Sequence, residues 1–221
     1  MGALDDVQLG PVPEERYGDV IQHLRHSFFA DEPLNSAVQL CRPGEPHAEL
    51  EHHSLSTLAD GLSQMAVHVA TGEVVGVALN GVQRPGDLKA AQAKLAGLAD
   101  LKFRLIFDLL YSANLRLDLF AEHGVDRLFE CRILSVDRRF RGRGLARALL
   151  LRSEEVARQH GFKVFKEDAT GFFSQRVAES VGLRAVSELK YCEHIAPETG
   201  EAVFKTQPPH ESLKIMVKIL Q

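Results

Sequence analysis

The chain has 221 residues, 45% of them hydrophobic and 25% charged, so it is long enough to bury one substantial core as a single domain over residues 1–221. Its net charge of −4 argues against a general nucleic-acid-binding protein, because affinity for a phosphate backbone needs a basic surface. It has no run of 18 apolar residues and no apolar signal-peptide core after its acidic start, so we expect no membrane partner.

Three cysteines, Cys41, Cys131 and Cys192, are odd in number and far apart in the sequence. This usage predicts reduced thiols and a cytoplasmic protein. Ten histidines are present, but their spacing matches no zinc motif, so we expect no metal. A monomer is the default expectation.

The first half of the chain predicts a short strand, a helix and a hairpin. A helix that follows Pro11 and Pro13 has an apolar stripe, and it breaks where Pro33 pushes the preceding residue out of the helical region. Two segments rich in β-branched residues flank a turn at residues 71–73. The expected elements are a strand at 7–9, a helix ending near 29, irregular and partly helical chain at 36–64, and strands at 65–70 and 74–81.

The second half alternates helices and strands. Residues 87–123 are rich in Ala and Leu, and a stripe of Leu101, Leu105 and Leu109 with Ile106 and Leu110 predicts that they are helical. The remaining expected elements are strands at 128–136, 163–166, 184–191 and 213–219, and helices at 145–159 and 172–181. This order predicts a mixed α/β sheet.

The strongest motif joins the strand at 128–136 to the helix at 145–159. Its loop reads R-G-R-G-L-A at residues 141–146. A loop at a helix N-terminus offers backbone N–H groups that lack partners within the helix, and glycine lets that backbone approach an anion closely. A pyrophosphate suits such a loop. A basic strand-to-helix turn without special purpose is the alternative, while Walker A and dinucleotide fingerprints are missing.

At this point the sequence resembles the GNAT superfamily of acetyltransferases. The residues from Arg141 to Ala146 fit its [RQ]-x-x-G-x-[GA] acetyl-CoA motif, and a second register begins at Arg139. The resemblance implies a GNAT fold, here with a helical insertion around 87–123, and acetyl-CoA as cosubstrate. It also implies that the preceding strand pairs with the pantetheine arm. The implied acetyl-CoA-binding residues are Leu134, Ser135, Val136, Arg141, Gly142, Arg143, Gly144, Leu145 and Ala146.

Further blocks narrow the resemblance to the insect arylalkylamine N-acetyltransferases, which acetylate dopamine and serotonin. They are F-F-A-D-E-P-L-N at 28–35, I-L-S-V-D at 133–137, F-S-Q-R-V at 173–177 and the tail from 203 to 210. The blocks occur in the family's order and cover nearly the whole chain. The resemblance implies a small amine as the substrate, whose acetylation proceeds by direct attack on the thioester.

Amine acetylation needs a base. A primary ammonium of pKa about 10.4 costs roughly 4–5 kcal/mol to deprotonate at pH 7. Glu32 is the candidate. The residues alone favour the interpretation that Asp31 and Glu32 cap a surface loop, and the resemblance reverses this, because the family has its catalytic glutamate at this motif. Asp31 is expected either to raise the pKa of Glu32 by repulsion or to bind the substrate cation.

The departing thiolate needs a proton or a hydrogen bond. The resemblance implies two hydroxyls four residues apart, and they match Thr170 and Ser174, with Thr170 standing where some relatives have serine. Ser174 reads equally well as a helix cap. A backbone N–H between Leu134 and Val136 is expected to polarise the thioester oxygen.

The amine pocket is the least determined part of the site. His210 matches a histidine of the family's tail, and Phe29 belongs to the block that contains Glu32; both are candidate substrate-binding residues, although His210 also reads as an exposed loop residue. An aromatic wall for the substrate is a hypothesis that rests on the residues Phe28, Phe29, Phe172, Phe173 and Tyr111. Cys131 and Cys192, both in expected strands, are interpreted as core residues rather than nucleophiles.

Two alternatives remain open. The same chemistry could serve a polyamine or another aliphatic amine, which would favour acidic rather than aromatic pocket walls. A non-catalytic acyl-CoA-binding module is the second alternative.

Overall fold

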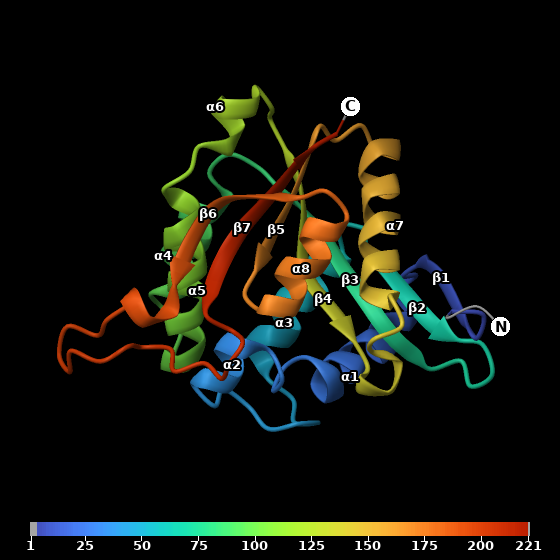
Figure 1. The fold of residues 1–221 in the computed structure, drawn as a ribbon, viewed down its shortest axis with the longest axis horizontal. Helices are drawn as coiled ribbons and strands as arrows, with labels where there is room; N and C mark the ends of the chain where they lie inside the picture. Colours follow the sequence, from blue (N-terminus) through green and yellow to red (C-terminus); the bar gives the residue numbers. More distant parts are fainter. Residues whose placement is uncertain (1–3, 221) are drawn as a thin grey trace.

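The computed structural model describes residues 4–220, which form a seven-stranded sheet with helices on both faces (Figure 1). The strands lie in the order β1-β2-β3-β4-β5-β7-β6. Their bounds are β1 Val7–Pro11, β2 Gln64–His68, β3 Val74–Gln83, β4 Leu128–Val136, β5 Val164–Ala169, β6 Arg184–Lys190 and β7 Ser212–Ile219. Neighbouring strands are antiparallel, except that β4 and β5 run parallel. The predicted mixed α/β sheet is confirmed.

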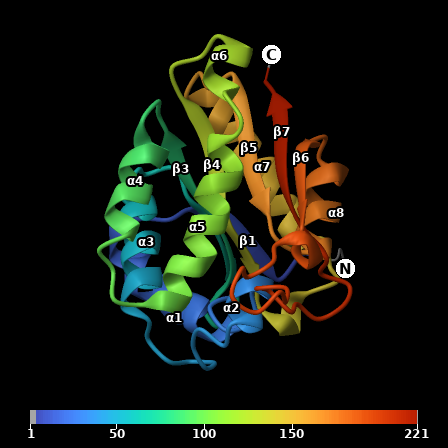
Figure 2. The same ribbon diagram turned by 90° about the vertical axis from the view of Figure 1, so that its left-hand side faces the viewer.

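The helices divide between the two faces of the sheet. Their bounds are α1 Tyr17–Ser27, α2 Pro33–Ala37, α3 Ala48–Leu58, α4 Asp87–Leu95, α5 Leu101–Leu115, α6 Leu119–His123, α7 Leu145–Gln159 and α8 Phe172–Ser180. Figures 1 and 2 show α1, α3, α4 and α5 on one side and α7 and α8 on the other. Each face buries its own apolar cluster, with α1, α3 and α5 in one and α7 and α8 in the other.

The elements next to the glycine-rich loop have the predicted bounds. β4 and α7 begin and end at the expected residues. α7 buries Leu145, Leu149 and Val156, which lie on one face because four residues make about one turn. Gly161, with a φ of +71°, follows the helix where the left-handed conformation is required.

Two expectations about the elements are wrong in part. Of the stripe predicted on residues 101–110, Ile106 and Leu109 are buried, but Leu101 and Leu105 are 66% and 46% exposed, while Phe103 and Phe107 are buried in their place. Cys192 lies exposed in a short 3-10 helix at Tyr191–Glu193 rather than in a strand.

β4 and β5 separate after a short paired stretch, and this separation positions the site. Parallel pairing joins residues 129–131 to residues 165–167 and stops there. At the same place the β3–β4 register skips Arg132, which is therefore the extra residue of a bulge. A bulge bends its strand, so β4 turns away from β5. The result is a wedge between the two strands, with Cys131 and Glu167 at its apex.

Candidate active site

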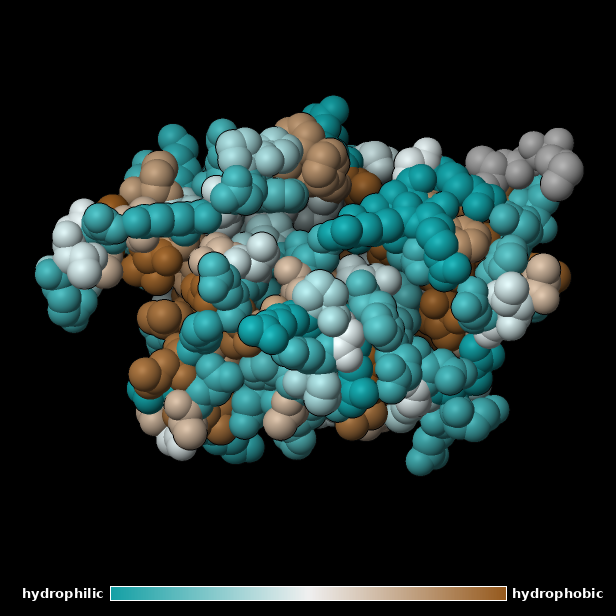
Figure 3. All heavy atoms as spheres, turned by 90° about the horizontal axis from the view of Figure 1, so that it is seen from below, coloured by the Kyte–Doolittle hydropathy of each residue, from teal (hydrophilic) through white to brown (hydrophobic). Residues whose placement is uncertain are grey.

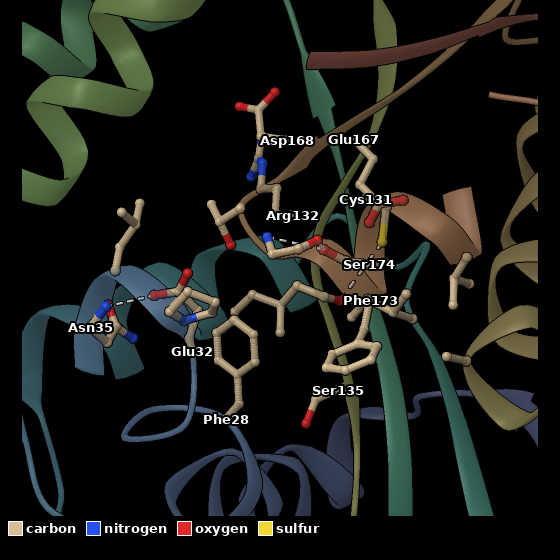
Figure 4. Close-up of a pocket in the computed structure, with 18 of the residues that line it drawn as sticks. Phe28, Glu32, Asn35, Cys131, Arg132, Ser135, Glu167, Asp168, Phe173 and Ser174 are labelled. Carbon is tan, nitrogen blue, oxygen red and sulfur yellow. Dashed lines mark hydrogen bonds between the residues drawn. The ribbon is translucent and has the colours of Figure 1, made fainter. Parts of the chain in front are cut away.

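A cavity of about 1070 Å³ passes through this wedge. It begins at the glycine-rich loop and the first turn of α7, follows β4, and ends between α3, α4 and α5. Seen from below, the molecule is largely hydrophilic, with apolar side chains showing between the polar ones (Figure 3). Figure 4 shows residues from both sides of the wedge facing this space.

The glycine-rich loop has the conformation that an anion site needs. Gly142 and Gly144 have φ values of +74° and +84°, and a Cβ built on either meets no atom within 4 Å. Side chains are strained at such φ values, and the space beside both glycines is open. Gly144 precedes α7, whose first backbone N–H groups have no partners within the helix. The loop, with Leu145 and Ala146, therefore fits a pyrophosphate.

The side chains of the loop arginines Arg141 and Arg143 lie in different places. Arg141 lines the cavity, and its Nε donates to the Val136 carbonyl over 2.9 Å. Arg143 does not line the cavity, because its guanidinium is paired with Asp6 at the start of β1. The expectation that its side chain lies at the acetyl-CoA site is therefore wrong. Arg147, one turn into α7, lines the cavity instead, and no motif singled it out.

The open edge of β4 presents alternate backbone groups to the cavity. Beyond the bulge, no strand among residues 4–220 pairs with the side of β4 that faces β5. The Asp137 N–H donates to Val75 of β3, so strand alternation turns the backbone groups of Leu134 and Val136 toward the wedge. These two residues can pair with a pantetheine arm and supply an oxyanion donor.

Ser135 also lines the cavity but differs from its two neighbours in orientation. Its backbone points toward β3, and its hydroxyl lies 3.0 Å from Nε2 of buried His23 in α1. Burial lowers the pKa of His23 to about 4, so the imidazole is neutral. Nδ1 of His23 donates to the Val74 carbonyl over 3.2 Å, which leaves Nε2 to accept from Ser135.

Glu32 occupies the position expected of a base. It is the N-cap of α2, and Pro33 holds the first helical position. One carboxyl oxygen accepts from the Asn35 N–H over 2.7 Å, while Oε1 is buried without a partner of regular geometry among the described residues (Figure 4). Burial raises the pKa of Glu32, and hydrogen bonding from Thr170 and the start of α2 partly offsets this. A buried carboxyl that faces the cavity suits proton abstraction.

Asp31 does not take either expected role. Its two carboxyl oxygens bind the guanidinium groups of Arg138 and Arg141, the latter over 2.8 Å. Burial alone would raise the pKa of Asp31, but these two arginines lower it. Asp31 therefore anchors the glycine-rich loop to the end of α1, and its charge is already neutralised.

The two expected hydroxyls lie in different settings. Thr170 lines the cavity and its side chain favours the charged form of Glu32, so it belongs with the base. Ser174 also lines the cavity, but its hydroxyl donates to the Gly171 carbonyl over 2.9 Å and accepts from the Gly171 N–H over 3.4 Å, the second of which caps α8.

His210 joins the tail of the chain to α8 at the edge of the cavity. Its Nδ1 accepts from the Phe172 N–H over 3.2 Å, and its ring packs against Phe173 with centroids 5.7 Å apart. A Cβ on Gly171 would lie 2.9 Å from Nδ1 of His210 and 3.1 Å from Pro33. Glycine is required there, because the tail, α2 and α8 meet at that point.

Only some of the residues expected to form an aromatic wall line the cavity. Phe28, Phe173 and Tyr111 line the cavity. Phe29 is fully buried among core residues and does not line it, so the expectation that Phe29 binds the substrate is wrong. The fifth residue, Phe172, is exposed and also lies outside the cavity.

A buried charged network at the wedge was not found from the sequence. Lys166 is fully buried and pairs with Glu130 and with Asp168, the latter over 2.8 Å. Arg132 donates to Glu130 over 3.0 Å, and Asn114 of α5 donates to Asp168 over 2.7 Å. Burial would raise the pKa of Glu130, but Lys166 and Arg132 hold it at about 2. The available signal was charge inside two strands: Glu130 and Arg132 at alternate positions of β4, and three consecutive charged residues at 166–168 of β5.

Cys131 lines the cavity as a buried thiol, and burial raises its pKa well above the usual range, which disfavours a nucleophilic thiolate.

Within residues 4–220, no group of His, Cys, Asp or Glu side chains is arranged to hold a metal ion. No helix in the same residues is long and apolar enough to cross a membrane.

A glycine-rich loop at a helix N-terminus, an open strand edge beside it and a buried carboxyl group in one cavity are the features that an acyltransferase using a CoA thioester needs. The family model named "Acetyltransferase (GNAT) family" matches residues 34–182. The chain belongs to this family, whose enzymes use acetyl-CoA, and it is an acetyltransferase.

Several solved structures are similar to this chain over nearly its whole length. Arylalkylamine N-acetyltransferase 2 from Aedes aegypti is 49% identical, with a TM-score of 0.95 over 98% of this chain and 100% of that one. The mosquito arylalkylamine N-acetyltransferase like 5b is 26% identical, with a TM-score of 0.86 over 97% and 100%. The Drosophila melanogaster polyamine N-acetyltransferase, described as forming N-acetylagmatine, shares the fold at 24% identity, with a TM-score of 0.85 over 97% and 100%. The resemblance drawn from the motifs is confirmed.

Proposed function

We propose that the enzyme transfers the acetyl group of acetyl-CoA to the primary amine of a small arylalkylamine such as dopamine, serotonin or tyramine. The observation that carries this proposal is the wall of the cavity beyond Glu32. That wall is built from aromatic and aliphatic side chains of α3, of α5 and of the residue that follows α1, namely Phe28, Leu50, Ile106, Phe107, Leu110 and Tyr111. Such a surface suits an aryl ring.

The charges of the cavity support the same choice. A second ammonium group of a polyamine would need a carboxylate to pair with it. Asp31 is neutralised by two arginines, and Glu130 and Asp168 flank Lys166. The deep carboxylates are therefore already paired, and an apolar ring is the better match.

In the proposed reaction, acetyl-CoA lies with its pyrophosphate on the loop at 141–146 and its pantetheine arm along β4. Glu32 removes a proton from the ammonium group, and the free amine attacks the carbonyl carbon of the thioester. An N–H of Leu134 or Val136 stabilises the negative charge on the carbonyl oxygen. The C–S bond then breaks and CoA leaves.

One observation favours an aliphatic diamine as a second candidate. Asp87 lies exposed at the rim of the cavity, near the start of α4. Its carboxylate accepts from the backbone N–H of Arg84 over 2.8 Å and is open to solvent. A long diamine could reach it. A non-catalytic module is disfavoured, because Glu32 retains a buried, incompletely bonded carboxyl inside the cavity.

Two phenylalanines provide a matched test of the aryl pocket. Phe28 lines the cavity and Phe172 does not. We expect Phe28→Leu to lower kcat/KM for tyramine about 3–10-fold, since an aromatic pair contributes about 0.5–1.5 kcal/mol beyond its area. The same variant should change kcat/KM for agmatine by less than about twofold, and Phe172→Leu should leave both unchanged. Equal losses for both amines in Phe28→Leu, or a preference of the wild type for agmatine, would contradict the proposal.

A further inference from the structure

Glu167 stands at the apex of the wedge, where β4 and β5 part. It is opposite Cys131 in the last paired position of the two strands. Beyond this pair the edge of β4 is open, and the carbonyl carbon of the thioester must lie along that edge to reach the oxyanion donors described above. Glu167 therefore lies at the closed end of the channel that the pantetheine arm enters.

Its side chain faces the acetyl-CoA side of the sheet. Alternation along β5 sends Lys166 and Asp168 to the amine side, where they form the charged network, and sends Glu167 to the side of α7 and α8. Figure 4 shows its carboxyl beside the sulfur of Cys131 and near Ser174, with Asp168 pointing the other way. Glu167 is 3% exposed, lines the cavity, and its Oε2 has no hydrogen-bond partner among the described residues.

The surroundings hold this carboxyl in its neutral form. The residues opposite Glu167 in the sheet are Cys131 of β4 and Met216 of β7, and Figure 4 shows the uncharged Ser174 of α8 nearby. Burial, and next the charge of Asp168, raise the pKa of Glu167 to about 8. A neutral carboxyl donates a proton, and a buried one without a partner is poised to do so.

The hydroxyls expected to assist the leaving group are engaged elsewhere. Ser174 already donates to Gly171, and Thr170 lies with Glu32. We propose that Glu167 is the catalytic acid that protonates the CoA sulfur, an inference that rests on the proposed acetyl transfer.

The step balances without a further reactant. Glu32 takes one proton from the ammonium group and passes it to solvent before the attack. The amine nitrogen then bonds to the carbonyl carbon, and Glu32 accepts the second proton from the nitrogen of the tetrahedral intermediate. When the C–S bond breaks, its electron pair goes to sulfur and the carboxyl proton of Glu167 goes with it, which gives the CoA thiol and the amide. Glu167 is left as a carboxylate and regains a proton from solvent when CoA departs.

The first test follows the pH dependence of turnover. CoA release with the best amine should be measured from pH 6 to 10 for the wild type, Glu167→Gln and Glu167→Asp. We expect kcat of the wild type to fall at alkaline pH as Glu167 loses its proton. Glu167→Gln should lower kcat about 10²-fold and lose that alkaline limb, with KM for acetyl-CoA within about twofold, and Glu167→Asp should keep the limb. Unchanged kcat, or a loss without a change in the shape of the profile, would overturn the proposal.

The second test needs no amine and so separates this inference from the proposed function. Calorimetry should compare CoA with desulfo-CoA, which lacks the sulfur. The wild type should bind CoA about 2–10-fold more tightly, as a hydrogen bond to sulfur predicts, and Glu167→Leu should abolish this preference. An equal affinity of the wild type for both ligands, or a preference that survives in Glu167→Leu, would overturn the proposal even if every amine proves inactive.

Discussion

Carboxyl groups on the cavity wall differ in their charge because their surroundings differ. Asp31 is bound by two arginines and stays ionised. Glu32 and Glu167 are buried with an oxygen left unbonded among the described residues, and burial raises the pKa of each. These protonation states suit Asp31 as a structural anchor, Glu32 as the proposed base and Glu167 as the proposed acid.

Glu32→Gln tests the base. The amide keeps the size of the side chain but cannot accept the amine proton, so we expect kcat to fall about 10²–10⁴-fold at neutral pH. The acidic limb of kcat/KM, which the raised pKa of Glu32 places above the usual range of a glutamate, should disappear. Acetyl-CoA affinity, measured by calorimetry, should stay within about twofold, since the group binds the amine side. An unchanged pH profile would remove Glu32 from this role.

Glu167 also predicts how stability depends on pH. Its pKa is about 8 in the folded protein against an ordinary 4.5, so the folded state holds a proton that the unfolded state has lost between these values. Stability contributed by this group is therefore present below pH 4.5 and lost as pH rises to 8. Relative to the wild type, Glu167→Gln should gain on the order of 1–3 kcal/mol between pH 5 and pH 8.

Thermal unfolding at the two pH values checks this gain. Glu198→Gln, in an exposed loop, serves as the control and should show no such change. A constant difference between Glu167→Gln and the wild type at both pH values would mean that Glu167 is already ionised in the folded protein.

At the scale of elements, the glycine-rich loop and α7 form one unit for anion binding. Gly144→Val should weaken acetyl-CoA binding at least about tenfold, because the side chain enters the open phosphate space and is strained at a φ of +84°. Gly200→Val is the matched control, with a φ of +70° and equally open space in a loop away from the cavity. Calorimetric titration of both variants with acetyl-CoA separates the effect of backbone strain from that of blocked binding. Similar affinities of the two variants for acetyl-CoA would show that this loop does not bind the phosphates.

Local patterns predicted the elements well where periodicity and turn residues agreed. β4, α7 and the β2–β3 hairpin follow directly from apolar runs bounded by glycine and charged residues. The stripe on α5 was only partly right: Ile106 and Leu109 are buried, but α5 has apolar residues on several sides, and Phe103 and Phe107 pack in the core instead of Leu101 and Leu105.

The candidate site was only partly predictable, because several of its properties arise between distant segments. Glu32, Thr170 and the loop were found by motif. The pairing of Asp31 with the loop arginines, the displacement of Arg143 to Asp6 and the burial of Phe29 depend on contacts across more than 100 residues or on packing depth. No sequence motif pointed to Glu167, because the burial of its carboxyl group depends on its position where β4 and β5 separate.

At the scale of the whole molecule, one cavity passes through the split sheet, with α7 and α8 on one side of the wedge and α1 to α5 on the other. The proposed function places acetyl-CoA at the end with the glycine-rich loop and the amine at the end between α3, α4 and α5. Under this proposal, α4 and α5 contribute much of the pocket that distinguishes one amine from another.

The rate of CoA release across an amine panel tests the central claim most directly. The panel contains acetyl-CoA with dopamine, serotonin, tyramine, spermidine, agmatine or a histone-tail peptide, and a thiol reagent follows free CoA. We expect the three arylalkylamines to give the highest kcat/KM, because the ring fills the apolar wall while the amine meets Glu32. Turnover confined to spermidine and agmatine, or to the peptide, would contradict the assignment of the amine pocket.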